Sequence, residues 1–374
     1  MSEHELIFSS KATAEAGTFK LLELPPELCK LTESCMEAGF PCRFTIRGEK
    51  GEDAVLCTAS STYAMRTVLL SNSVLVVTPL DASTLDFDEN KIAIRDQVNS
   101  IIELSPIVPR LQKLAELLKG NEYNEASAEE DAEGVENITR TRIMYEDVRG
   151  RIQASDEELE RGLRDRRILN IHGELRPVSP PYLKTILEAI LTLLVSYSIP
   201  HNNASVELLS LYLDSDHEIP RSVSAQVMLC FGTIKDGFWT MDVNAIVRQV
   251  GLGLLRPHVN KPISRQALLT QWRDAVGDTF SGAVALPLLA GNFLTEPSDG
   301  LTYYPSASLP TEPARRFADL FLVRSRWKAD DIAPFLEDIT MDQKEREKLL
   351  LKYARAVTDP QSGVLYTARA QYAG

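Results

Sequence analysis

The stretch from Asp53 to Val77, DAVLCTASSTYAMRTVLLSNSVLVV, constrains the possible fold more than any other part of the sequence. Apolar residues alternate through its first two runs, and the run from Val74 to Val77 is apolar without a break. This pattern, with Ser- and Asn-containing segments between the runs, predicts three short strands joined by turns.

Further short apolar runs extend the strand-rich region to Leu104, and one helix is predicted around Glu27 to Ala38. Short strands joined by turns favour an antiparallel sheet or barrel over βαβ units. A single helix cannot cover both apolar faces of such a sheet, and an open strand edge invites pairing with another chain. Residues 1–104 therefore either close on themselves or are completed by strands from a partner.

After Pro106 the sequence predicts a recurring order of helices followed by a short hairpin. Three helices and a β-wing in roughly sixty residues are typical of the winged form of the helix-turn-helix. The predicted fold class is therefore α+β, a portion of a β-barrel followed by a tandem array of winged helices. Their predicted bounds are 105–180, 181–241, 242–309 and 310–374. The first is interrupted by a linker over 120–137, within which residues 122–136 hold seven acids and no base.

The distribution of charge bears on nucleic-acid binding. A net charge of −13 argues against a protein that coats nucleic acid along its whole surface. Residues 310–374, however, carry eleven Lys and Arg against ten Asp and Glu, which makes this end the least acidic part of the chain. Its basic residues either form a solvated face or contact DNA. The row Lys344, Lys348, Lys352 and Arg355 is predicted to lie on the third helix of the last winged helix. The candidate DNA contacts are Arg315, Arg316, Arg324, Arg326, Lys328, Lys344, Lys348, Lys352, Arg355 and Arg369.

Sequence motifs for catalysis are missing. The chain has no G-x-x-x-x-G-K-[ST], G-x-G-x-x-G, H-E-x-x-H or G-x-S-x-G pattern. Cys29, Cys35 and Cys42 are spaced too widely for a zinc module, and Cys57 is predicted to be a small core residue rather than a nucleophile. Trp327 is interpreted as a packing residue rather than a base-stacking one. We therefore expect no enzymatic activity, no cofactor and no metal site.

Targeting and membrane signals are also missing from the sequence. The start, MSEHELIFSS, does not have the pattern of a signal peptide, and the apolar run near Ile186 to Val195 is too short to cross a bilayer. Five irregularly spaced cysteines then suggest reduced intracellular thiols.

Several blocks resemble a known family. They are FKLLELPPEL, DAVLCTASSTYAMRTVLLSNSVLVV, IQASDEELERGL and RWKADDIAPFLEDI with the following LLLKYAR and GVLYTAR. Together they resemble the subunit named for defective sister chromatid cohesion, which belongs to the alternative replication factor C clamp loader of chromosome transmission fidelity. The resemblance covers nearly the whole chain in order, with residues 200–300 departing most.

This resemblance implies a non-catalytic nuclear subunit. Its N-terminal strands would join strands from a small partner subunit and from the C-terminal tail of the large ATPase subunit. Its winged helices would bind single- and double-stranded DNA, and the barrel region with the adjacent winged helix would dock on the catalytic subunit of polymerase epsilon. The complex would load and unload the sliding clamp. The expected partner-strand residues are Val55, Cys57, Tyr63, Met65, Val68, Leu70, Val74 and Val76. The alternative is a free-standing winged-helix DNA-binding regulator whose N-terminal sheet closes alone.

Overall fold

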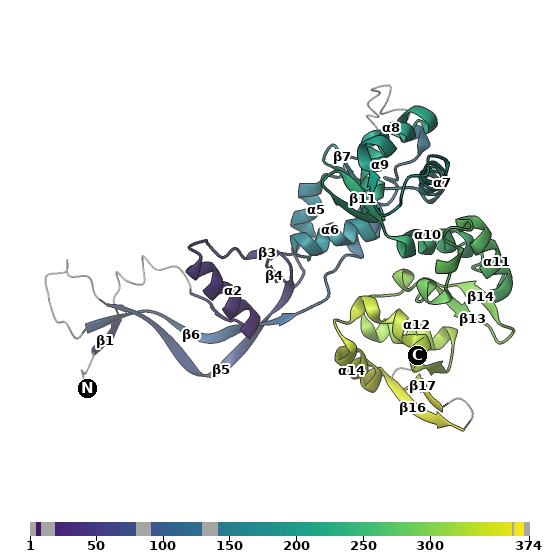
Figure 1. Cartoon of the computed structure of the whole chain (residues 1–374). Helices are drawn as coiled ribbons and strands as arrows, with labels where there is room; N and C mark the ends of the chain where they lie inside the picture. Colours follow the sequence, from purple (N-terminus) through teal and green to yellow (C-terminus); the bar gives the residue numbers. More distant parts are fainter. Residues whose placement is uncertain (1–4, 9–18, 80–90, 129–140, 361–362, 370–374) are drawn as a thin grey trace. The chain divides into compact units, whose positions relative to one another are not determined.

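The computed structural model describes residues 5–8, 19–79, 91–128, 141–360 and 363–369. The chain divides into two compact units, the first formed by residues 1–109 with 153–157 and the second by the remaining residues. Strands and helices are mixed along the chain, and the sheets are several and small, which makes the fold α+β (Figure 1).

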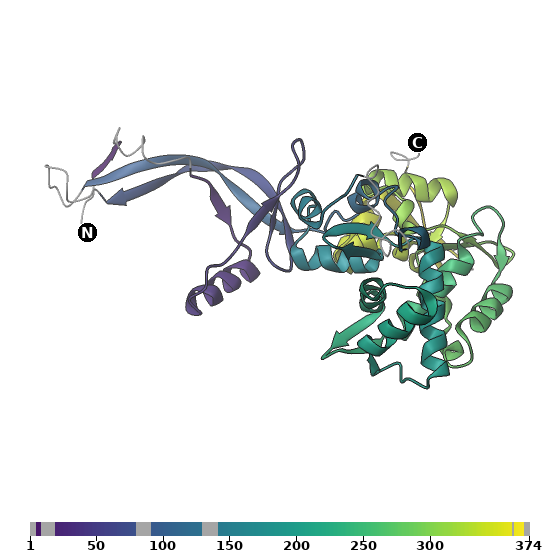
Figure 2. The same ribbon diagram turned by 90° about the horizontal axis from the view of Figure 1, so that it is seen from above.

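The first unit is built around two long strands, β5 and β6, which run side by side as a curved ribbon (Figures 1 and 2). They belong to a six-stranded sheet of order β1-β6-β5-β4-β3, in which β2 also pairs with β6. The elements are β1 (Glu5–Phe8), β2 (Leu21–Glu23), α2 (Pro26–Glu37), β3 (Thr45–Arg47), β4 (Val55–Cys57), β5 (Thr62–Pro79) and β6 (Lys91–Pro106).

This sheet corrects two sequence-based expectations. β1 and β2 pair with β6 in parallel, so the sheet is mixed rather than antiparallel; among the described strands it is open. The residues Tyr63 to Val77 form one strand, not two, because a shift of register between Leu69 and Val74 absorbs the polar segment that was predicted to be a turn.

A small core holds α2 against the sheet. Leu28 of α2 packs with Leu56, Tyr63 and Leu104, and it is the one buried residue of that helix. The segment 153–157 completes this unit: Arg47 is buried, donates to the carbonyl of Ala154 and pairs with Asp156. The first unit therefore has little apolar core for the length of its two long strands.

The second unit repeats one order of elements. Three times, a helix leads through a two-residue strand into further helical turns and then a hairpin, and the two-residue strand pairs with the second hairpin strand. Each resulting three-stranded sheet is antiparallel throughout. One buried tryptophan belongs to each repeat, namely Trp239, Trp272 and Trp327.

The elements of the second unit begin with α3 (Lys113–Leu117), α5 (Tyr145–Arg151), α6 (Asp156–Asp165, whose first two residues count with the first unit), β7 (Ile168–Ile171) and β8 (Glu174–Pro177). The first repeat contains α7 (Pro180–Ser196), β9 (Ala204–Ser205), α8 (Val206–His217), α9 (Arg221–Cys230), β10 (Gly232–Lys235) and β11 (Phe238–Met241). The second contains α10 (Val243–Leu255), β12 (Ile263–Ser264), α11 (Arg265–Val276), η1 (Ser281–Ala283), η2 (Leu286–Leu289), β13 (Phe293–Thr295) and β14 (Gly300–Tyr303). The third contains η3 (Ser306–Ser308), α12 (Pro313–Val323), β15 (Trp327–Lys328), α13 (Ala329–Ile332), η4 (Ala333–Phe335), η5 (Glu337–Ile339), α14 (Gln343–Tyr353), β16 (Ala354–Asp359) and β17 (Gly363–Ala368).

Two segments of the second unit contain 3-10 turns in place of a longer α-helix. The run GAVALPLLAG forms two 3-10 turns, and ADDIAPFLEDI forms a four-residue α-helix followed by two 3-10 turns. Pro287 and Pro334 account for this, because a proline lacks the backbone N–H that would continue an α-helix. The described residues contain no helix that is both long and apolar enough to span a membrane.

Candidate interaction surfaces

The outer edge of β5 is the first candidate surface. β4 pairs only with Thr62, Tyr63 and Ala64, so from Met65 to Val77 β5 has a strand partner on the β6 side alone among the described residues. Such an edge presents backbone N–H and C=O groups that another strand can bind.

Apolar side chains accompany this open edge. The side chain of Leu69 is 82% exposed, and those of Val74, Leu75 and Val77 are also exposed. Large apolar residues are exposed elsewhere in the same unit, in and around β2, α2 and β3: Phe19, Leu22, Leu31, Met36, Phe40, Phe44 and Ile46. Exposed apolar side chains on neighbouring elements of one unit make this unit a candidate interaction site, because large exposed apolar patches mark such sites.

The residues predicted to meet partner strands fall into two groups. Met65, Val68, Leu70 and Val76 are half-buried and Val74 is exposed, so part of each side chain is accessible. Val55, Cys57 and Tyr63 are buried within the chain, at 2%, 1% and 5% exposure, so their side chains leave no free surface for a partner strand. β3 and β5 flank β4 on both edges at this point and already cover it.

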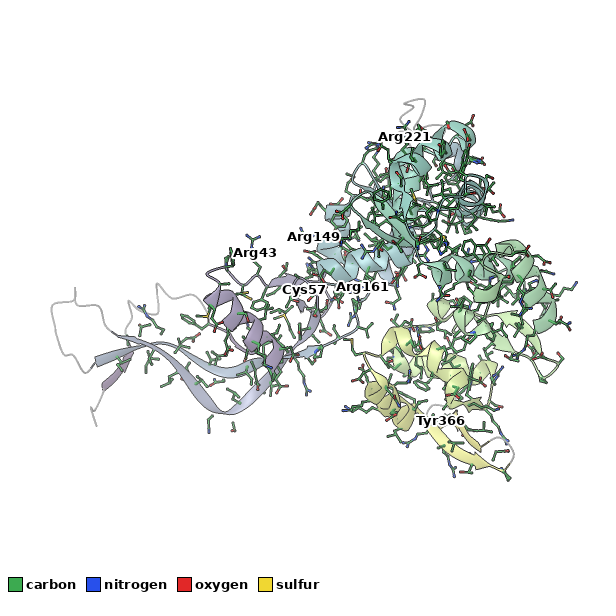
Figure 3. All side chains as sticks on the ribbon, in the orientation of Figure 1. Arg43, Cys57, Arg149, Arg161, Arg221 and Tyr366 are labelled. Carbon is green, nitrogen blue, oxygen red and sulfur yellow. The ribbon has the colours of Figure 1, made fainter. Side chains whose placement is uncertain are left out.

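The interpretation of Cys57 as a core residue is confirmed. It lies in β4 (labelled in Figure 3), and its thiol is 3.8 Å from the hydroxyl of Thr62. Burial also raises the pKa of Cys230 to about 11, so that thiol stays protonated near neutral pH. A nucleophilic cysteine needs the opposite shift together with an accessible sulfur. The described residues contain no group of three His, Cys, Asp or Glu that could hold a metal.

The basic residues of the third repeat form the second candidate surface. Lys344, Lys348 and Lys352 are exposed at intervals of four along α14, so they lie on one face of that helix. The other exposed cations of this region are Arg315, Arg326, Lys328, Arg355 and Arg369. Glu345 lies at the start of α14, where its carboxylate accepts a hydrogen bond from the backbone N–H of Met341. The carboxylate of Glu347 accepts a hydrogen bond from the side-chain amide of Gln343.

Arg316 is not part of that surface, contrary to the sequence-based expectation. It is completely buried, and its guanidinium makes a bidentate pair with Asp338. Its remaining donors reach the carbonyls of Leu309, Pro310 and Phe335 at 3.2, 2.6 and 2.8 Å. Arg316 is therefore a structural residue that ties α12 to the turns η4 and η5.

Two further expectations for the basic residues need correction. Arg324 is held within the unit: it donates to the carbonyl of Thr295 at 2.5 Å, lies 3.7 Å from Asp331 and stacks on Trp327. Arg355 was placed on the third helix, but α14 ends at Tyr353, and Arg355 lies on β16 opposite Thr367.

Trp327 is 1% exposed and packs on Phe335, which confirms its interpretation as a packing residue. The hairpin strand β17 carries Tyr366, labelled in Figure 3.

An open strand edge with exposed apolar side chains and a face of exposed cations are features typical of proteins that bind other macromolecules. Residues 19–336 match the model of the family described as sister chromatid cohesion protein Dcc1. The sister chromatid cohesion protein DCC1 of Xenopus tropicalis is 30% identical over 384 residues, covering 98% of the chain and 92% of that protein. The human protein of the same name is 28% identical, with 95% and 90% covered.

The protein of this name from Saccharomyces cerevisiae is 26% identical over 120 residues, which are 31% of either chain. The chain belongs to the Dcc1 family of sister chromatid cohesion proteins, and the resemblance seen in the quoted sequence blocks is confirmed. It therefore has a role in sister chromatid cohesion, which is consistent with a nuclear protein.

Proposed function

We propose that the chain is a non-catalytic adaptor subunit of an alternative clamp loader. In this role it links the C-terminal tail of the large ATPase subunit and a small partner subunit to the catalytic subunit of polymerase epsilon and to DNA. The assembly then supports the loading and unloading of the sliding clamp during replication, and through it sister chromatid cohesion.

The observation that carries this proposal is the open edge of β5 with its exposed apolar side chains. Val68, Leu69 and Leu70 are apolar at consecutive positions, which is the pattern of a strand covered on both faces. Leu69 is 82% exposed among the described residues, which supports a covering surface from another molecule. Partner strands paired along β5 would form hydrogen bonds with the backbone groups of its open edge and would also bury its exposed apolar side chains.

The repeats of the second unit support the DNA-contacting part of the proposal. Helices followed by a three-stranded antiparallel sheet fit tandem winged-helix domains. The cations of α14 and of the last hairpin are suited to phosphate contacts, which position a protein on DNA without reading its sequence. A free-standing regulator is less well supported, because its N-terminal sheet would have to be self-sufficient.

The assembly can be tested by replacing exposed apolar residues of the open edge of β5 with lysines. We expect Leu69→Lys with Val77→Lys to weaken binding to the large-subunit tail and the small subunit by at least about tenfold, since charge on an edge strand opposes strand addition. Co-purification and titration of the three chains measure this. Both residues are exposed, so the thermal midpoint of the chain alone should stay within a few degrees.

The matched control is Leu351→Lys, which places the same charge on an apolar side chain of the second unit that is 70% exposed. It should leave the assembly intact. If the edge variant assembles as tightly as the parent chain, partner strands do not pair along β5. A parent chain that stays monodisperse and binds neither subunit would favour the free-standing regulator.

A further inference from the structure

A groove in the second unit lies between the helices α7 and α10, with one residue of α11 at its side (elements in Figure 1). Its volume is about 390 Å³. It is lined on the α7 side by Pro180, Pro181, Lys184, Leu187, Glu188 and Leu191, and on the other side by Gln249, Val250, Gly253, Leu254, Arg256 and Ala275. The apolar residues of its floor continue the main core of this unit, because Leu187 belongs to that core and Leu191, Val250 and Leu254 pack against it.

The floor of the groove is open at Gly253. A Cβ atom added there would meet no atom within 4 Å, whereas one added at Gly251, one half-turn earlier in α10, would lie 2.5 Å from the ring of Trp272. Packing inside the chain thus explains Gly251 but not Gly253. A glycine in the interior of a helix costs roughly 0.5–1 kcal/mol relative to alanine, and close approach of another backbone is one use of such a position.

The polar rim of the groove is cationic on balance. Lys184 pairs with Glu188 at 3.7 Å, which leaves the half-buried Arg256 as the second cation of the rim. Among the described residues, no side chain or carbonyl accepts a hydrogen bond from the Arg256 guanidinium, and no carboxylate pairs with it. The same holds for the side-chain amide of Gln249. Because the net charge of the chain is −13, an acidic segment would be attracted to a locally cationic rim such as the one at Arg256.

We propose that this groove binds an amphipathic helix of a partner protein, with a carboxylate of that helix placed against Arg256. A helix fits better than a strand because both walls are helices and offer side chains in ridges rather than a free strand edge. The lining residues of α7 extend from Pro180 to Leu191, a length of about 17 Å, which accommodates about three turns. The partner segment would carry apolar residues three or four positions apart, as helices that bind in grooves do.

Two designed helical peptides test this proposal on the full chain. Both have leucines at i, i+3, i+4 and i+7, and they differ in carrying either glutamates or lysines beside that stripe. Fluorescence anisotropy should show the glutamate peptide binding at least about tenfold more tightly. With Arg256→Glu the order of the two peptides should reverse, since the charge at the rim is then negative. Non-specific binding to exposed apolar surface elsewhere in the chain would not reverse in this way.

A second variant separates the groove from other surfaces. Gly253→Gln fills the open floor, should weaken both peptides by at least about tenfold, and should leave the thermal midpoint unchanged or higher because glutamine favours a helix over glycine. The proposal is wrong if neither peptide binds, if Arg256→Glu leaves their order unchanged, or if Gly253→Gln has no effect. If neither peptide binds but the parent chain binds a small apolar dye and Gly253→Gln abolishes that dye binding, the groove takes a small molecule instead.

Discussion

Replacing Arg316 with alanine is expected to lower the free energy of unfolding of the second unit by about 3–5 kcal/mol, the usual cost of removing one partner from a buried ion pair. The change leaves Asp338 without its cation and removes the donor from three carbonyl groups. Arg316→Lys should recover only part of the loss, because an ammonium cannot reproduce five donors in a planar fork. Urea unfolding followed by tryptophan fluorescence measures both variants.

Arg315→Ala is the matched control for that experiment. Arg315 is the preceding residue on α12, its side chain is 79% exposed, and its partner Glu312 is one helical turn away at 3.0 Å. Exposed pairs of this kind contribute about 0.2–1 kcal/mol. If Arg316→Ala were as mild as Arg315→Ala, the buried pair with Asp338 would not support the third repeat, and Arg316 would return to the candidates for DNA contact.

Reversing the charge of the exposed basic residues should abolish most DNA binding. The change consists of Lys344, Lys348, Lys352 and Arg326, each replaced by glutamate. Arg324 is left unchanged, since its bonds within the unit would turn its loss into a folding defect. Four phosphate contacts correspond to a slope of about −3.6 in a plot of log affinity against log salt concentration. Their loss should lower the affinity at 0.1 M salt by about three orders of magnitude and make the slope shallower by about 3.6.

The loss should be equal for DNA duplexes of unrelated sequence, because contacts to phosphates carry no direct sequence information. Fluorescence anisotropy at several salt concentrations provides both numbers. Glu345 and Glu347 replaced by glutamine make a suitable control, since the change removes negative charge from the same helix and should strengthen binding. A quadruple variant that binds like the parent chain at every salt concentration would show that DNA contact lies elsewhere in the chain or belongs to its partners.

Sequence patterns predicted the local elements well where the signal was short-range. Pro26 begins α2, as is usual for a proline at a helix start, and the helix lies where it was predicted. Two of the hairpins turn at residues with positive φ: His172 and Gly173 between β7 and β8 have angles of 51° and 90°, and Asp299 between β13 and β14 has one of 62°. Such angles suit the tight turns that join antiparallel strands.

Long-range contacts explain what the sequence did not reveal. Arg316 and Arg315 are neighbours in the sequence, and the anion that distinguishes them, Asp338, is 22 residues away. One signal was nevertheless available: Arg316 lies four residues before the buried Leu320 and next to Phe317, so it shares the apolar face of α12. The continuity of β5 depends in the same way on its pairing with β6, which no local pattern in the segment SNS encodes.

Amide hydrogen exchange along β5 tests the central claim most directly. It should be recorded on the full chain, first alone and then with the large-subunit tail and the small subunit bound. Partner strands paired along the open edge should slow exchange between Met65 and Val77 by about a hundredfold or more, while the amides of α7 and α10 change little. Equal exchange of residues 65–77 in the two states, or strong protection in the chain alone, would contradict the proposal that β5 is completed by its partners.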